Sequence, residues 1–265
     1  MANKLNEDIL SAAKSGDFTP IFSSIPSPEL LRELGYLTGR HSNPTALERL
    51  FTLGLTIPPE SENNPIFHGA LESESIPIFQ VLLNNGFNLN NHWSESLGDG
   101  IVVAAMRGNI PLAAFLLGNG QDPNNGSSSG DREAIIWAMV GDFPSLEFIK
   151  LMLRYGFKTQ GTGAAIAAAE LGNLEALKLF VETDRDLDLE EKVIWHAVGD
   201  RESFGSEGTA LYRACRAGKM GTVEYLLGKG VDATSTDRMG RSCMDVAKAG
   251  GYEDVVELLR KHLEE

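Results

Sequence analysis

The sequence predicts an all-α fold, an α-solenoid in which short helix-turn-helix repeats stack on one another. Residues 208–259 carry the first observation, because four kinds of position recur there after 33 residues: Thr209 and Ser242, Ala214 and Ala247, Gly218 and Gly251, Leu226 and Leu259. Recurrence at one fixed spacing is the mark of a repeat architecture. The second observation is that two short helices cannot bury both of their faces alone, so each repeat must pack against its neighbours.

The repeat unit can be derived from residues 209–230. Thr209 is expected to cap a first helix that places three side chains on one buried face, namely Leu211, Ala214 and Cys215. Gly218 permits a tight turn, and the second helix then carries a buried stripe at the i, i+3, i+4 spacing, namely Val223, Leu226 and Leu227. Gly230 can take the left-handed conformation that ends a helix at low cost. Each repeat is therefore expected to be a pair of antiparallel helices.

Residues 209–214 read T-A-L-Y-R-A, which resembles the T-P-L-H-x-A motif of the ankyrin repeat. Residues 65–70 resemble the same motif, with His68 at the position of the structural histidine. The resemblance implies a single domain over residues 1–265, an α-solenoid of about eight ankyrin-like repeats with finger loops. The expected repeats span residues 5–26, 27–57, 63–90, 97–124, 131–158, 162–184, 207–238 and 240–263, with an insertion at 185–206.

The N-terminal repeats are the most divergent. We expect a helix near residues 6–13 and a partner helix at 18–25, which Pro20 and Pro26 shorten. A cap residue followed by proline predicts helix starts at Ser27 and Asn43. At residues 163–166 the capping threonine of the motif is missing, so we expect that repeat to be less stable than its neighbours.

The insertion is inferred from spacing, because Ala168 and Ala214 are 46 residues apart instead of 33. Its first part belongs to the acidic run 182–191, which predicts a solvated loop. On that basis, replacing residues 184–191 with a Gly/Ser linker should leave the melting temperature nearly unchanged. Residues 193–198 are apolar enough to form an extra helical turn or two packed on the stack. They also resemble residues 135–140, either as a truncated repeat or by coincidence.

Composition restricts the classes of partner. The formal net charge of −14 disfavours nucleic acid and anionic membranes. No apolar run approaches the roughly 18 residues of a membrane span, and residues 1–8 lack the apolar stretch of a signal peptide. Cys215 and Cys243 fall at core positions of the repeat and are expected to be buried thiols in a reducing compartment. We therefore expect a cytoplasmic protein, with the nucleus as the alternative.

No sequence motif supports catalysis. Residues 126–130 fit G-x-S-x-G, but the flanks are those of a Gly/Ser loop and not of a strand and a helix. Residues 161–163 begin like a dinucleotide fingerprint, which Ile166 then breaks. The five histidines have no metal-ligand spacing. We expect no catalytic residue, no cofactor and no metal.

The binding residues are expected on finger loops and first helices, where the resemblance places a concave groove. Aromatic candidates are His92 and Trp93 at the tip of a loop and Trp137 on the first helix of repeat five; the alternatives are packing against a neighbouring finger and burial toward the next repeat. Basic candidates are Arg213 and Arg216 in repeat seven with Arg238 on the next finger, for which the alternative is ordinary solvation. Repeat four adds Met106 and Arg107.

The favoured function is a non-catalytic protein–protein interaction module, or scaffold, that binds a partner protein in the concave groove. The partner is expected to carry apolar side chains opposite repeats four and five and acidic residues opposite repeat seven. An enzyme or small-molecule binder with a pocket near 185–206 stays open as the alternative, as does a self-associating scaffold. A closed apolar pocket beside the insertion would favour the small-molecule function, and an open groove would favour a protein partner.

Overall fold

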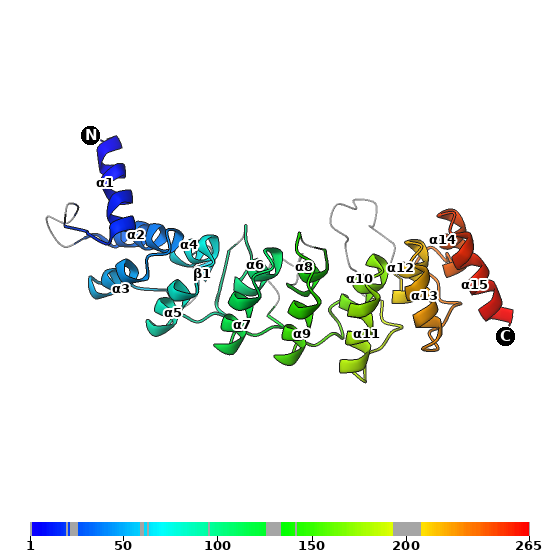
Figure 1. Cartoon of the computed structure of the whole chain (residues 1–265). Helices are drawn as coiled ribbons and strands as arrows, with labels where there is room; N and C mark the ends of the chain where they lie inside the picture. The colour runs from blue at the N-terminus through cyan, green and yellow to red at the C-terminus, as the bar shows by residue number, and fades with distance from the viewer. Residues whose placement is uncertain are drawn as a thin grey trace. The chain divides into compact units, whose positions relative to one another are not determined.

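The structure is a computed structural model, and helices dominate it (Figure 1). It describes residues 2–19, 21, 26–58, 61–62, 64–94, 96–125, 134–140, 142–192 and 208–264. The chain divides into two compact units, Met1–Ala134 and Ile135–Glu265, which we call unit 1 and unit 2. Over the described residues, the expected all-α fold class is confirmed.

Unit 1 contains seven helices within its described residues: α1 (Ala2–Ser15), α2 (Pro28–Arg40), α3 (Pro44–Thr52), α4 (Pro65–Ser73), α5 (Ile76–Asn84), α6 (Gly100–Met106) and α7 (Ile110–Gly118). The helix α2 packs against α4, α3 packs against α5, and α6 packs against α7. Two strands of two residues each, β1 (Ser61–Glu62) and β2 (His92–Trp93), pair in parallel, with Ser61 opposite His92. The pairs α2–α3 and α4–α5 thus stack first helix on first helix and second on second.

Unit 2 holds the remaining helices: α8 (Ala134–Val140, of which Ala134 belongs to unit 1), α9 (Leu146–Arg154), α10 (Ala164–Leu171), α11 (Leu174–Thr183), α12 (Ala210–Arg216), α13 (Met220–Leu227), α14 (Cys243–Ala249) and α15 (Glu253–Glu264). The first helices α10, α12 and α14 pack in succession, and α13 packs against α15. Where these first helices meet, Ala168, Ala214 and Ala247 are fully buried. Small side chains at this position let neighbouring helices approach closely.

Side chains cap the first helices where the sequence predicts it. Thr209 accepts a hydrogen bond from the backbone N–H of Tyr212 (3.3 Å), and Ser242 forms a reciprocal capping box with Asp245. By contrast, Gly163 supplies no side-chain cap to α10, as the loss of the threonine predicted. A capping side chain is typically worth about 1 kcal/mol, so α10 lacks a contribution that α12 and α14 have.

Asp99 caps α6 in a buried setting. Its carboxylate accepts the N–H of Val102 (2.9 Å), and its residue is 5% exposed. Burial raises the pKa of Asp99 to about 6, against the opposing effect of hydrogen bonds from the backbone N–H groups of Val102 and Ile101. Desolvation therefore outweighs the favourable cap geometry for the charged form.

The tight turn after α12 depends on Gly218. Its φ is +65°, a value that residues with a side chain adopt rarely. A β-carbon there would also come within 2.5 Å of the Tyr252 ring, which belongs to the next turn along unit 2. Glycine is thus required both by the backbone conformation and by the approach of the neighbouring turn.

The loops that follow the second helices are joined by hydrogen bonds of one kind, in which a side chain of one loop accepts a backbone N–H of the next. Asn90 accepts the N–H of Asp122 (2.7 Å) in unit 1. In unit 2, Gln160 accepts the N–H of Asp188 (2.8 Å), and Glu190 accepts the N–H of Asp232 (2.6 Å). Each bond links one loop to the next loop of the stack.

This ladder corrects the expected start of the insertion. Residues 184–192 form an ordinary loop of the stack, held by Gln160 on one side and by Asp232 on the other. The excess over the repeat period therefore falls within 193–207. The apolar stretch 193–198 and the Gly/Ser stretch 126–130 lie outside the described residues.

The second helix expected at 18–25 is not found where the chain is described. Phe18, Thr19 and Ile21 have no helical conformation, and residues 20 and 22–25 lie outside the described residues. Phe18 is 1% exposed, so it is held by packing without a helix. The expected helix near 6–13 is present as part of α1, and the expected helix starts are confirmed, because Ser27 and Asn43 cap α2 and α3. Cys215 and Cys243 are buried free thiols.

Truncating Leu226 to alanine should destabilise unit 2. The side chain is fully buried on α13, which packs against α12 and α15, so the loss should be about 2–5 kcal/mol in urea unfolding. Hydrogen exchange should accelerate most in residues 208–264. Leu263→Ala, at a position 49% exposed, is the control and should cost less than about 0.5 kcal/mol. Uniform acceleration from residue 10 to residue 260 would contradict neighbour-only coupling.

Replacing residues 184–191 with a Gly/Ser linker should lower the melting temperature, contrary to the expectation from charge alone. The replacement removes the Glu190 side chain that accepts the Asp232 N–H, and a flexible linker no longer holds the backbone N–H of residue 188 in place to donate to Gln160. The single variant Glu190→Ala should account for part of the loss, since it deletes one side-chain acceptor worth about 1 kcal/mol. Asp186→Ala, an exposed position in the same loop, should leave the transition unchanged. Equal melting temperatures for all variants would show that the ladder does not stabilise the stack.

Asp99→Asn should stabilise the protein at neutral pH. Because its pKa is raised, the folded state retains a proton that the unfolded chain, with a pKa near 3.8, releases. Stability should therefore fall as pH rises from about 4 to about 6. Asparagine keeps the cap without the charge, so it should add roughly 1–3 kcal/mol at pH 7 and little at pH 4. Asp245→Asn, in an exposed cap where hydrogen bonds from Ser242 lower the pKa, should show no such gain. If the free energy of unfolding of the wild type and of Asp99→Asn depended on pH in the same way, the raised pKa of Asp99 would be refuted.

Candidate binding surface

The C-terminal ends of the first helices carry alternating charges at one repeat position. This position lies two residues before the left-handed residue that follows the helix. It is occupied by Arg40 and Glu72 in unit 1, and by Glu170 and Arg216 in unit 2. Arg40 pairs with Glu72 (Nε to Oε2, 3.3 Å), and Arg216 pairs with Glu170 (Nη2 to Oε1, 3.3 Å). Neighbouring helices therefore offset each other's charge along this row.

In unit 1 the row extends into a polar network around Tyr36. The Tyr36 hydroxyl donates to Glu72 (3.0 Å) and accepts from Arg40 (3.2 Å). Burial raises the pKa of Tyr36, and the hydrogen bond to Glu72 and its charge raise it further. The phenol thus stays protonated and ties α2 to α4.

Three side chains in this network have the order of a catalytic triad, namely Ser94, His68 and Glu72. His68 Nδ1 lies 3.0 Å from Ser94 Oγ, and its Nε2 lies 3.8 Å from Glu72. The Ser94 hydroxyl also accepts the N–H of Leu97 (3.3 Å), and the residue is 2% exposed. A nucleophile must reach a substrate, which this buried hydroxyl does not. His68 instead fastens the loop after α5, in keeping with the structural role expected for it.

His92 is not the exposed loop tip that the sequence predicts. It is 2% exposed, and its ring stacks on Phe87 with 4.2 Å between centroids. His92 lies on β2, which pairs with β1, and its ring also lies near that of Phe67 on α4, with 6.2 Å between centroids. Trp93, the other residue of β2, is half-buried, so part of its ring is accessible.

Met106 and Arg107 lie at the end of α6, as expected. Met106 is half-buried, and Arg107 is exposed. Arg107 Nη1 lies 2.7 Å from Glu74 Oε1, and Asn109 donates to the other oxygen of Glu74 (2.9 Å). Glu74 ends α4, so this ion pair joins two successive turns of unit 1.

Arg213 also differs from the position that the sequence predicts. The sequence places it on the open side of α12, but it is 2% exposed. The helix lies between α10 and α14, which leaves little of its surface open. Arg213 Nη1 reaches Glu170 Oε1 (3.4 Å), the oxygen that Arg216 also contacts. Arg213 is therefore a structural charge, whereas Arg216 is 28% exposed.

Glu170 was not singled out from the sequence. The available signal was its position, since Glu170 and Arg216 precede equivalent turn glycines by two residues. Trp137, on α8, is half-buried, so neither full exposure nor full burial describes it.

Arg238 lies exposed on the loop after α13, beside a rigid turn built on Asp237. The Asp237 carboxylate accepts from the Tyr212 hydroxyl (2.7 Å) and from Arg241 Nε (2.8 Å). Burial alone would raise the pKa of Asp237, but these hydrogen bonds and those from backbone N–H groups lower it to about 2. The turn therefore holds its shape at neutral pH and fixes where Arg238 leaves the backbone.

The predicted residues thus fall into three groups. Arg107 and Arg238 are exposed; Trp93, Met106, Trp137 and Arg216 are half-buried; His92 and Arg213 are buried. The first two groups can contact a partner in this conformation. Most of the stretch 185–206, beside which the alternative function places a pocket, lies outside the described residues from 193 onward.

Comparison with known proteins agrees with the repeat pattern. Residues 101–193 match the family model described as ankyrin repeats (3 copies), which covers α6 to the loop after α11. No curated protein matches the chain at a significant level. Among the described residues, no helix is long and apolar enough to cross a membrane. Ankyrin repeats are generally protein–protein interaction modules. This match supports an ankyrin-repeat protein, and helix pairs, caps and turns of the same kind also lie outside the matched residues.

Proposed function

We propose that this protein is a non-catalytic interaction module, or scaffold, that binds a partner protein through the first helices and finger loops of an array of eight repeats. The observation that carries the proposal is the incomplete burial of Trp93 and Trp137. Large aromatic side chains that remain partly open on a rigid scaffold are common anchors of protein interfaces. They lie on β2 and α8, the two kinds of element that line the concave groove in ankyrin proteins.

The basic residues support a second part of the proposal, an acidic portion of the partner. Arg216 and Arg238 are accessible in unit 2 and come from a first helix and a finger loop. Glu170 already offsets part of the Arg216 charge, so the arginines should contribute more to association rate and register than to affinity. Met106 in unit 1 and Trp137 in unit 2 would each offer a contact to an apolar side chain of the partner.

The tryptophan anchors are testable with a partner recovered on the intact chain and then purified. Trp137→Ala should weaken its binding about tenfold or more at both low and high salt, because the lost contact is apolar. Tyr155→Ala removes an aromatic side chain that is 42% exposed at the end of α9 and should have no effect. Circular dichroism of both variants checks that the helices remain intact.

The basic contribution is tested with Arg216→Glu/Arg238→Glu, which should weaken binding chiefly at low salt. Arg213 is unsuitable, because a glutamate there would bury a second carboxylate against Glu170. Arg260→Glu, on α15 at a side chain 54% exposed, is the matched control. Unchanged binding for both Trp137→Ala and the double variant would reject the groove as the interface.

A further inference from the structure

In unit 2, the turns that join first to second helices touch one another in succession. A β-carbon at Gly172 would come within 2.8 Å of Lys219 Cδ, and one at Gly218 would come within 2.5 Å of the Tyr252 ring. The turns α10–α11, α12–α13 and α14–α15 therefore form one continuous surface. We call it the turn edge.

The turn edge exposes a large apolar side chain at every turn. Leu171 is 37% exposed, Met220 38% and Tyr252 37%. The turn before them in sequence, between α8 and α9, carries Phe143 at 58%. Single exposed apolar residues are ordinary, but a row of them over successive turns is typical of a binding surface.

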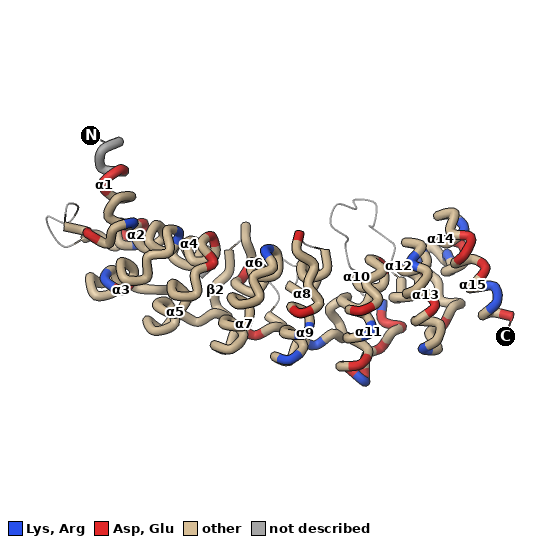
Figure 2. Tube along the Cα trace, in the orientation of Figure 1, with Lys and Arg blue, Asp and Glu red and all other residues tan. Residues whose placement is uncertain are grey.

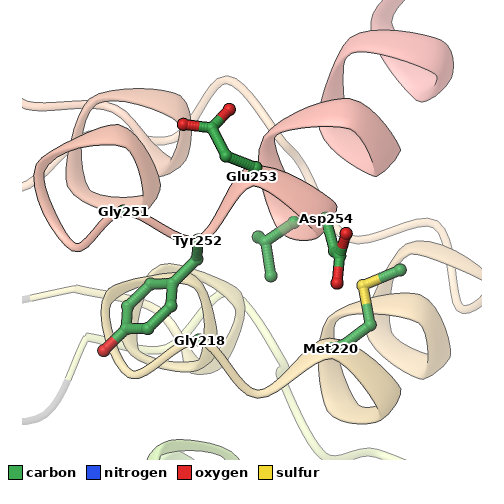
Figure 3. Close-up of a pocket in the computed structure, with 7 residues that line it drawn as sticks. Gly218, Met220, Gly251, Tyr252, Glu253 and Asp254 are labelled. Carbon is green, nitrogen blue, oxygen red and sulfur yellow. The ribbon is translucent and has the colours of Figure 1, made fainter.

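Between two of these side chains lies a pocket. Met220 and Tyr252 supply its apolar walls, and Glu253, Asp254 and Val255 complete it (Figure 3). Figure 3 shows the Asp254 carboxylate beside the Met220 side chain, while Tyr252 lies over Gly218. The volume of ≈ 290 Å³ is at the lower limit for small-molecule sites and suits one inserted side chain.

The charge around this edge is strongly one-sided. Residues 142–147, 171–175, 217–221 and 250–254 contain five carboxylates and one ammonium group, that of Lys219. Figure 2 shows the acidic residues at the start of α15. Glu253 and Asp254 are exposed and make no hydrogen bond or ion pair with another side chain among the described residues. Their position at a helix N-terminus favours negative charge, but it does not account for the apolar row beside them.

We propose that the turn edge docks a basic amphipathic segment of another protein. An apolar side chain of that segment fits between Met220 and Tyr252, and an adjacent lysine or arginine contacts Glu253 and Asp254. The Tyr252 ring adds an attraction for the cation. A second copy of this chain is disfavoured as occupant, because two chains of net charge −14 repel each other. The residues that carry this surface differ from those proposed for the groove, of which Arg216 comes nearest, two residues before Gly218.

The probes are three synthetic capped peptides with a common helical pattern. The first carries leucines at i, i+3, i+4 and i+7 with lysines elsewhere; the second replaces the lysines with glutamates, and the third replaces the leucines with serines. The Lys/Leu peptide should bind the full chain at least tenfold more tightly than either other peptide, as measured by fluorescence anisotropy. Amide shifts in NMR spectra should map to 217–221 and 250–255.

Two pairs of variants locate the binding. Met220→Ser should weaken the Lys/Leu peptide about tenfold, and Met239→Ser, at a methionine 74% exposed on a finger loop, should not. Glu253→Gln/Asp254→Asn should weaken it severalfold at low salt. Glu182→Gln/Asp186→Asn makes the same change in net charge at exposed sites away from the edge and should have less than a twofold effect.

Equal weakening in both members of either pair would show nonspecific adsorption to an acidic protein and overturn the proposal. So would equal binding of the Lys/Leu and Lys/Ser peptides, or absence of binding by the Lys/Leu peptide. Trp137→Ala should leave peptide binding intact. Failure of the turn edge is therefore distinguishable from failure of the groove.

Discussion

The structure depends on the close approach of successive first helices. In unit 2 this approach rests on alanines, because Ala168, Ala214 and Ala247 are fully buried where α10, α12 and α14 meet. A larger side chain there would separate the helices and open gaps along their whole contact. No helix pair could retain its core without its neighbour, so the caps, turn glycines and loop ladder all serve to keep the pairs in register.

Close stacking also determines the electrostatics. A first helix with neighbours on both sides has few solvent-exposed positions, so even a charged residue on it can be buried. Arg213 is the clearest case, since it is 2% exposed and shares Glu170 with Arg216. An enclosed charge needs a partner, because an unpaired one would cost several kcal/mol. The alternation of acid and base at equivalent positions of neighbouring helices supplies that partner.

Much of this fold could be predicted from sequence because its determinants are local. Caps at Thr209 and Ser242, the turn at Gly218 and the buried stripe of α13 follow from residue type and spacing within one repeat. The failures involve neighbours: burial of His92 requires β1, burial of Arg213 requires α10 and α14, and the loop at 184–192 requires two other loops. The helix expected at 18–25 is a different case, since Phe18, Thr19 and Ile21 are not helical and Phe18 is buried without a helix.

If stacking consumes the faces of the helices, recognition must use what stacking leaves open, namely the finger loops, the ends of the first helices and the turns. The groove proposed for this chain uses the first two. In this chain those positions are partly committed to internal ion pairs, with Arg40, Arg107 and Arg216 each bound to a glutamate. The turns of unit 2 differ in this respect. Met220 and Tyr252 are exposed to solvent there, and the carboxylates of Glu253 and Asp254 lie beside them. A surface whose apolar groups and charges are not engaged within the fold loses less on binding than one whose ion pairs must first be broken. This difference supports the turn edge as a binding surface in its own right, opposite in charge to the arginines proposed for the groove.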